Sequence, residues 1–297
     1  MTESLATSAF VTAAWLARPP VDDVVILDCR FRLGNAQWGR EQYREGHIAG
    51  AVYADLEQDL SGRLGEHGGR HPLPDQGDFA AFAARLGIGA RTHVVAYDDS
   101  GEMAARCWWL FHYFSHDRVS VLQGGLQAWL EAGMSLVAGE DDTAGRRAAL
   151  SKTGGAAAGG FAPRPSWLAT HEQVRSAVDH GLVGAAFHLV DSRAPERYRG
   201  EVEPIDPVAG HIPGACNLLW SDAFQKPASL HANDRLRAHF ARVLDGKPII
   251  LYCGSGVTAS ANALALYELG IMAQVYAGSF SDWCSHADNP IATGEEP

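Results

Sequence analysis

Short apolar runs alternate with helical patterns along this chain. In the second half, runs at 187–193 ("FHLVDSR"), 248–253 ("PIILYC") and 273–278 ("AQVYAG") predict strands. They are almost continuously apolar, which is typical of parallel strands covered on both faces. Thr170 and Gln173 form a capping-box pattern at the start of a predicted helix. The alternation of strands and helices predicts an α/β fold built on open parallel sheets flanked by helices.

The pattern of the first half is repeated in the second. Four pairs of segments match in the same order: "VVILDCR" with "FHLVDSR", "EGHIAGAVYADL" with "AGHIPGACNLLW", "THVVAYDDSG" with "KPIILYCGSG", and "VSVLQGGLQAW" with "AQVYAGSFSDW". An ordered repeat of this length indicates two homologous domains. We predict a first domain over 1–138 and a second over 162–297, joined by an alanine- and glycine-rich linker over 139–161.

Composition and charge exclude several classes of function. The chain has 297 residues, a formal net charge of −11 and five cysteines, none of them in C-x-x-C spacing. The negative charge argues against nucleic acid or an anionic membrane as partner. Neither a zinc ribbon nor a thioredoxin-type dithiol can be read from the cysteines, and we expect a reducing, cytoplasmic location. The first residues match neither a signal peptide nor a membrane span.

The most informative short segment follows the strand predicted at 248–253. There Cys253 stands between the strand and a helical pattern, followed by Gly254, Ser255, Gly256, Val257 and Thr258. Catalytic groups of open α/β sheets lie beyond the carboxyl ends of the strands. Glycines let the chain curl tightly, so the backbone N–H groups of 254–258 can surround an anion and stabilise a thiolate. We therefore predict that Cys253 is a nucleophile.

Other interpretations of this loop fit less well. An isolated cysteine is usually a buried structural residue, and we interpret the other four cysteines in that way. A phosphatase would need an arginine six residues after the nucleophile, where this chain has Ala259. No phosphate-binding G-K-[ST] motif is present either. In the first half the position of Cys253 is occupied by Asp98, so we expect one catalytic half and one non-catalytic half.

These segments resemble the tandem-domain rhodanese family, and "CGSGVTA" is similar to the active-site loop of its 3-mercaptopyruvate sulfurtransferases. The resemblance covers nearly the whole chain, through "GHIAGA", "GHIPGA", "GRHPLP", "YDDSG", "RCWWL", "LQGGLQAW" and "AGSFSDW". It implies two rhodanese-like domains and transfer of sulfur through a persulfide on Cys253. It also implies a small anionic sulfur donor, an acceptor such as cyanide, a thiol or reduced thioredoxin, and no cofactor.

The resemblance also implies roles for individual residues. Arg197 matches an arginine that binds the anionic group of the donor, whereas a second family arginine, before "GHIPG", is missing from "EPIDPVAG". Ser255 matches a serine that handles protons together with a histidine and an aspartate of the first domain. His47 matches that histidine, with a structural role as the alternative, and no aspartate is found in the segment before it. Arg106 is expected at the domain interface, either near the site or in an ion pair.

The preferred donor is predicted from charge. Gly254 and Ser255 bring no cation next to the thiol, which favours monoanionic 3-mercaptopyruvate over dianionic thiosulfate. Two alternatives remain: a thiosulfate:cyanide sulfurtransferase, and a binding or regulatory module that uses the fold without catalysis.

Several residues outside the loop carry weaker expectations. Trp283 is a candidate wall of the pocket, although its repeat partner Trp129 favours packing for both. Arg70, in "HGGRHPLPD", could line the cleft. We interpret His112 and His116 as a pair on the surface of a helix. The dense aromatic residues of 108–114 predict core.

Overall fold

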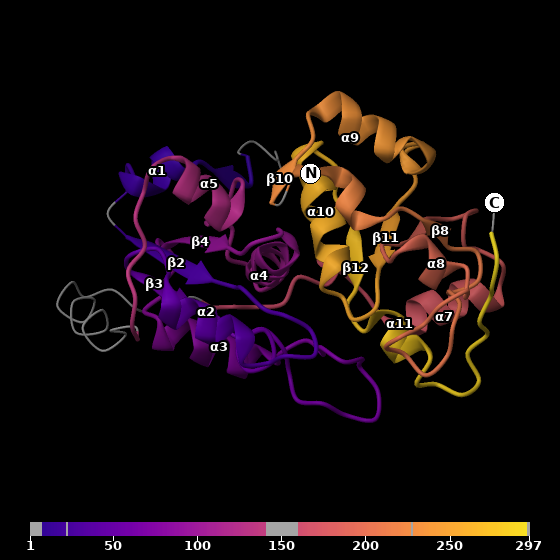
Figure 1. Ribbon diagram of the computed structural model, residues 1–297. Coiled ribbons are helices and arrows are strands. Elements are labelled where there is room, and N and C mark those ends of the chain that lie inside the picture. The colour runs from indigo at the N-terminus through magenta and orange to yellow at the C-terminus, as the bar shows by residue number, and fades with distance from the viewer. Residues whose placement is uncertain (1–7, 22, 141–159, 227, 296–297) are drawn as a thin grey trace.

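The computed structural model describes residues 8–21, 23–140, 160–226 and 228–295 (Figure 1). Its first half is a five-stranded parallel sheet with the strand order β1-β5-β4-β2-β3. The elements are β1 (Phe10–Val11), α1 (Ala13–Ala17), β2 (Val24–Asp28), α2 (Trp38–Glu45), β3 (Ala51–Tyr53), α3 (Gln76–Arg85), β4 (His93–Tyr97), α4 (Glu102–Tyr113), β5 (Val119–Leu122) and α5 (Gly125–Glu131).

The second half repeats this sheet, again parallel, with the order β6-β12-β11-β7-β8. The predicted α/β fold and its duplication are therefore confirmed. The elements are η1 (Pro165–Trp167), β6 (Leu168–Ala169), α7 (His171–Asp179), β7 (His188–Asp191), α8 (Pro195–Tyr198), β8 (Cys216–Asn217), η2 (Trp220–Ala223), β9 (Phe224–Lys226), β10 (Ser229–Leu230), α9 (Asn233–His239), η3 (Ala241–Val243), β11 (Ile249–Tyr252), α10 (Thr258–Glu268), β12 (Gln274–Tyr276) and α11 (Ser279–Trp283).

Helix ends follow local sequence signals. Thr170 caps α7, where its hydroxyl accepts a hydrogen bond from the Gln173 N–H over 3.2 Å. A threonine at this position satisfies one of the N–H groups that the first turn leaves unpaired. Gly181 follows the end of α7 with φ +64°, a backbone conformation that glycine adopts without steric cost. The predicted start of this helix is thus confirmed.

Each half contains the same buried ion pair. Arg30 binds Asp28 through Nη2 at 2.6 Å and donates to the Gly46 carbonyl. In the second half, Arg193 binds Asp191 at the same distance and donates to the carbonyl of Gly210. These pairs fix the carboxyl end of the second strand of each half to the loop that precedes the next strand.

Helices α4 and α10 lie side by side where the two halves meet (Figure 1). One apolar cluster extends from the face of the first sheet under α3 and α4 to the face of the second sheet under α10. Trp108 of α4 meets Tyr267 of α10 edge-on, with ring centroids 5.0 Å apart. The halves therefore share a continuous core, and the aromatic residues predicted as core lie in it.

The prediction of a surface pair at His112 and His116 is wrong, because both rings are buried. His112 Nδ1 lies 3.0 Å from the Asp117 carboxylate, and His116 Nε2 lies 3.0 Å from the Thr92 carbonyl. Both rings thus have polar partners inside the first half.

Most of the segment predicted as a linker, 139–161, lies outside the described residues. Its end packs on the first half, where Phe161 meets Phe79 edge-on at 5.5 Å. Among the residues that the structure describes, no helix is long and apolar enough to cross a membrane.

The buried ion pair yields a prediction about stability. Asp191→Asn removes the fully buried carboxylate that binds the Arg193 guanidinium at 2.6 Å, and leaves Glu203, at 3.3 Å, as the carboxylate that still pairs with Arg193. We expect a loss of about 3–5 kcal/mol in the free energy of unfolding. The matched control is Asp179→Asn, which breaks the exposed pair with Arg175 and should cost under about 1 kcal/mol. Urea unfolding of both variants measures the difference, and equal losses would contradict the assignment.

Candidate active site

Cys253 lies directly after β11, at the carboxyl edge of the second sheet. Its thiol is buried, and the Gly256 N–H donates a hydrogen bond to Sγ over 3.1 Å. An N–H group aimed at sulfur stabilises the thiolate more than the neutral thiol. The predicted place of Cys253 in a strand-to-helix loop is what the structure has.

Residues at the start of α11 hold this loop from behind. The Cys253 N–H donates to the Ser279 hydroxyl over 3.1 Å. In return, the N–H groups of Phe280 and Ser281 donate to the carbonyls of Cys253 and Gly254 over 3.0 and 2.9 Å. The backbone of the loop is thus fixed by hydrogen bonds before any ligand is considered.

Two glycines of the loop have no room for a side chain. Gly256 has φ +78°, and a Cβ there would stand 2.3 Å from the Ala277 carbonyl oxygen. A Cβ on Gly254 would stand 2.7 Å from Nη2 of Arg70. Gly256 permits the tight turn, and Gly254 leaves space for an arginine beside the thiol.

A cavity of about 540 Å³ opens in front of the thiol. Both halves line it. The second half contributes Cys253, Gly254, Ser255, Val257 and Thr258, together with Arg193, Ala194, Arg197, Ile205, Leu219 and Trp220. The first half contributes Arg30, Phe31, Arg32, Leu33, Trp38, Leu56, Arg70, His71, Asp98, Asp99, Ser100, Glu102 and Met103.

Two arginines face the loop from one side of the cavity. Arg197 Nη1 and Arg70 Nη2 lie 3.6 and 2.7 Å from the point where a Cβ of Gly254 would be. Asp206 joins them: it pairs with Arg70 Nη1, and with Arg197 Nη2 at 3.1 Å. Glu203 also binds Arg197, at 2.7 Å. The sequence predicted Arg197 at this place and named Arg70 as a residue that could line the cleft. It gave no sign of Asp206, because Asp206 is distant from Cys253 in the chain.

His71 lies next to the catalytic loop. Its Nδ1 is 2.7 Å from the Ser255 hydroxyl oxygen. Burial, reinforced by the charges of Arg106 and Arg70, lowers the pKa of His71 to about 4. The ring is therefore neutral near pH 7, and a neutral Nδ1 without a proton accepts the serine hydrogen.

Arg106 reaches the loop from behind rather than from the cavity. It is fully buried, and it donates through Nη1 to the Gly256 carbonyl at 3.4 Å and through Nη2 to the His71 carbonyl at 3.2 Å. Burial lowers its pKa to about 10. It does not line the cavity, so the geometry gives Arg106 a supporting contact across the domain interface.

The structure does not bring His47 to the site. Its ring stacks on Tyr43 with centroids 3.8 Å apart, and its Nδ1 lies 2.7 Å from the Tyr43 carbonyl. His211 makes the same two contacts with Tyr198 in the second half. A contact repeated in both halves belongs to the shared fold, and the histidine that lies beside Ser255 is His71.

Trp283 does not line the cavity either. Its ring is fully buried in the core beneath α7 and α11, and its Nε1 donates to the Pro290 carbonyl over 2.8 Å. The alternative noted from its repeat partner, a packing role, is what the structure has.

The first half keeps the shape of the loop with a different side chain. The Asp98 carboxylate accepts hydrogen bonds from the N–H groups of Gly101, Met103 and Ala104 over 2.7, 2.8 and 3.0 Å. Gly101 is three residues after Asp98, as Gly256 is after Cys253. A glycine N–H therefore donates to the side chain at the matched position in both halves, and only the second half carries a thiol there.

Known proteins share this sequence pattern over both halves. The family model described as "Rhodanese-like domain" matches residues 12–132 and 170–286. A Pseudomonas aeruginosa protein described as a probable 3-mercaptopyruvate sulfurtransferase is 39% identical, over 98% of this chain and all of that one. The human 3-mercaptopyruvate sulfurtransferase is 35% identical over 94% of this chain and 93% of its own length.

A second relative and a solved structure are also similar to this chain. A Mycobacterium tuberculosis relative, described provisionally as a thiosulfate sulfurtransferase, is 36% identical over 96% of both chains. The solved structure of a 3-mercaptopyruvate sulfurtransferase from Escherichia coli superposes with a TM-score of 0.74 at 30% identity. It covers 93% of this chain and all of that one.

Gly256 gives a test of the loop geometry. In Gly256→Ala the new methyl group meets the Ala277 carbonyl, so the loop has to move and the N–H of residue 256 leaves Sγ. We expect a loss of more than about 2 kcal/mol in stability and slower alkylation of Cys253. Gly270→Ala is the control, because Gly270 has φ +76° with nothing within 4 Å of the point where its Cβ would lie. Thermal unfolding and iodoacetamide rates check both, and equal effects would contradict the steric argument.

Proposed function

This chain belongs to the rhodanese family, in its tandem-domain form, and on that premise we propose that it transfers sulfur from 3-mercaptopyruvate to a thiophilic acceptor through a persulfide on Cys253. The observation that carries the proposal is the contact between the Gly256 N–H and Cys253 Sγ, at 3.1 Å, in a cavity faced by two arginines. The names of the relatives support the reaction class.

The first half-reaction forms the persulfide. The Cys253 thiolate attacks the sulfur of 3-mercaptopyruvate, forming an S–S bond while the C–S bond of the donor breaks. The electron pair of the broken bond moves to the donor carbon and its carbonyl, giving the enolate of pyruvate. This enolate takes up a proton and leaves as pyruvate. Sulfur remains on Cys253 as a persulfide, whose negative charge the loop amides stabilise.

Ser255 and His71 are placed to move the proton. The reaction needs the proton of the donor thiol to be removed from sulfur and a proton to be supplied to carbon. The hydroxyl of Ser255 lies at the cavity, and His71 Nδ1 is 2.7 Å from it. A neutral histidine can accept the hydroxyl proton and return it, and its low pKa, about 4, keeps it neutral across the range in which thiols react.

Arg197 and Arg70 form the proposed binding site for the donor carboxylate. Asp206 holds one nitrogen of each guanidinium, while the Nη atoms that face Gly254 point to the space beside the thiol. Two N–H donors from different arginines suit a planar carboxylate. Arg70 thus takes the role of the arginine missing from "EPIDPVAG", although it comes from the other half of the chain.

The charge balance of this group supports a monoanionic donor. Two arginines are paired with two carboxylates, Glu203 and Asp206, so the cluster as a whole has no excess positive charge. A dianion such as thiosulfate gains most from a net cationic site. We therefore keep thiosulfate:cyanide sulfurtransferase activity as the second candidate, which the Mycobacterium tuberculosis relative favours.

The second half-reaction passes the outer sulfur to the acceptor. A thiolate or cyanide attacks that sulfur, the S–S bond to Cys253 breaks, and the electron pair returns to the cysteine as thiolate. The cavity, at about 540 Å³, exceeds the size of the donor and leaves room for a small thiol. A thiol or a thioredoxin-like reductant as acceptor fits a reducing compartment such as the cytoplasm.

The reaction is tested by mass spectrometry and kinetics. Incubation with 3-mercaptopyruvate should add one sulfur atom to the wild-type chain and none to Cys253→Ser. Cys284→Ser is the matched control, because Cys284 is the most exposed of the other cysteines and should leave the persulfide intact. A much higher kcat/KM with thiosulfate would favour the second candidate. Failure of both donors to form a persulfide would favour a non-catalytic module.

The proposed binding of the donor carboxylate by Arg70 and Arg197 is tested by measuring donor binding and the reactivity of the Cys253 thiol separately. Arg70→Met and Arg197→Met each remove a charge-assisted hydrogen bond of about 1.5–3 kcal/mol, so KM for 3-mercaptopyruvate should rise roughly tenfold or more. The rate of Cys253 with neutral iodoacetamide should stay within about twofold of wild type. Arg32→Met is the control, since Arg32 lines the cavity but stacks on Trp38. Equal losses in both assays would make Arg70 and Arg197 structural.

A further inference from the structure

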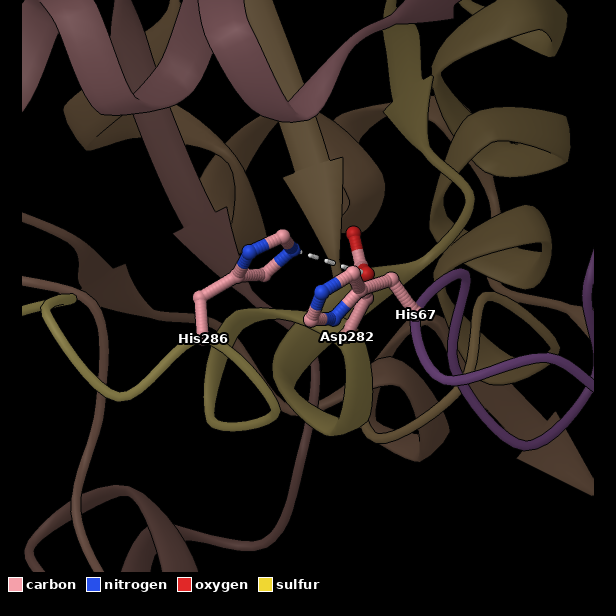
Figure 2. Close-up of side chains that lie close together, drawn as sticks. All are labelled: His67, Asp282 and His286. Carbon is pink, nitrogen blue, oxygen red and sulfur yellow. Dashed lines mark ion pairs between the residues drawn. The ribbon is translucent and has the colours of Figure 1, made fainter.

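A group of ionisable side chains lies outside the cavity, at the junction of the two halves. His67 comes from the first half, in the loop before α3, whereas Asp282 and His286 come from α11 and the turn after it (Figure 2). One possible ligand atom of each residue lies within 4.8 Å of those of the other two. None of the three lines the cavity at Cys253, and the sulfur-transfer chemistry makes no use of them.

We propose that His67, Asp282 and His286 bind a divalent metal ion of the Zn²⁺ class and so fasten the two halves together. Two imidazole nitrogens and one carboxylate oxygen suit borderline ions such as Zn²⁺ better than Mg²⁺ or Ca²⁺, which prefer oxygen. Three protein ligands leave the fourth tetrahedral position to water.

The neighbouring residues already orient the ligand atoms. His67 Nδ1 lies 2.8 Å from the Ser285 hydroxyl, which leaves Nε2 for the metal. The Tyr276 hydroxyl donates to Asp282 Oδ2 over 2.5 Å, so Oδ1 is the oxygen that faces the histidines. Metal ligands in proteins are oriented by such outer contacts, which fix the tautomer of a histidine and the rotation of a carboxylate.

One ligand is fixed and another is able to move. Asp282 is buried, and its Oδ1 accepts the Gly68 N–H over 2.7 Å, beside the Nε2 of His286 at 3.4 Å. The His67 ring is exposed and stacks on His286 with centroids 3.8 Å apart. A metal–nitrogen bond lies in the plane of the imidazole, so the stacked rings have to turn towards Asp282 when an ion binds. Rotation of an exposed side chain costs little.

The position of this group gives the ion a defined effect. The loop that carries His67 also carries Arg70 and His71 to the cavity. The same segment that provides Asp282 holds the backbone of the Cys253 loop, and Ser281 accepts the N–H of Arg70 over 3.1 Å. A metal ion between His67 and His286 would therefore fix the loop of the first half against α11.

The binding test needs no sulfur donor, so its result is independent of the proposed reaction. It uses the full-length chain without a histidine tag, in a Cys253→Ser background that removes the reactive thiol as a competing ligand. Calorimetric titration with Zn²⁺ should give one site per chain. Titration with Co²⁺ should give the visible absorption bands of a tetrahedral site with nitrogen and oxygen ligands.

Ligand variants decide which residues are responsible. His67→Gln and His286→Gln each remove a direct ligand, so the affinity for Zn²⁺ should fall at least about tenfold. His171→Gln is the matched control: His171 stacks on the other face of His286, with centroids 3.9 Å apart, but does not belong to the ligand group. It should bind Zn²⁺ like the parent.

Thermal unfolding provides a second measurement. An ion that binds only the folded, docked chain raises the midpoint as its concentration increases. We expect this rise in the parent and in His171→Gln, and its loss in the two ligand variants. Absence of a single stoichiometric site, or a site that survives both ligand substitutions, would overturn the proposal and leave a stacked histidine pair that bonds only with Asp282 and Ser285.

Discussion

The conformation of one short loop, residues 253–257, is the constraint on which the rest of the site depends. It is held in three directions: from below by β11, from behind by the residues of α11, and from the first half by the Arg106 contact with the Gly256 carbonyl. With these contacts in place, the N–H of Gly256 points at Cys253 Sγ. A side chain at residue 254 or 256 would meet Arg70 or the Ala277 carbonyl, so both positions are glycine.

Comparison of the two halves separates the contacts that support the fold, which both halves share, from the side chain proposed as nucleophile, which one half has. Both halves contain the buried aspartate–arginine pair, the tyrosine hydroxyl bonded to the loop before the third strand, and the histidine stacked on a tyrosine. Both halves also contain a glycine N–H that donates to a side chain three residues earlier in the chain. What differs is the acceptor, which is a carboxylate at Asp98 and a thiol at Cys253. Because a carboxylate cannot carry sulfur, the proposed chemistry has its nucleophile in the second half alone.

The sequence predicted those parts of the site that rest on contacts between residues close together in the chain, and missed those that rest on contacts between distant residues. The strands, the capping of α7 and the Cys253 loop rest on neighbours in the chain, and these predictions agree with the structure. Two roles were considered for His47, and its contacts fit the structural one. A match to a motif says nothing about packing, whereas the repeat partner His211 was a readable sign of a shared structural role. His71 and Arg70 come from the first half and approach the Cys253 loop only after the halves dock, and no local pattern encodes that docking. Asp206 belongs to the second half, but it is distant from Cys253 in the chain.

The docking also explains why the loop itself carries no cation. A basic side chain on residue 254 would occupy the space that Arg70 Nη2 and Arg197 Nη1 now face. Arginines brought from outside the loop can be balanced by their own carboxylates, as Asp206 balances both, without placing those carboxylates next to the thiol. The second half thereby keeps small residues around sulfur, where the attacking geometry needs room. The first half, which has Asp98 where the second has Cys253, contributes Arg70 and His71 to the cavity, so the proposed site needs both halves in contact.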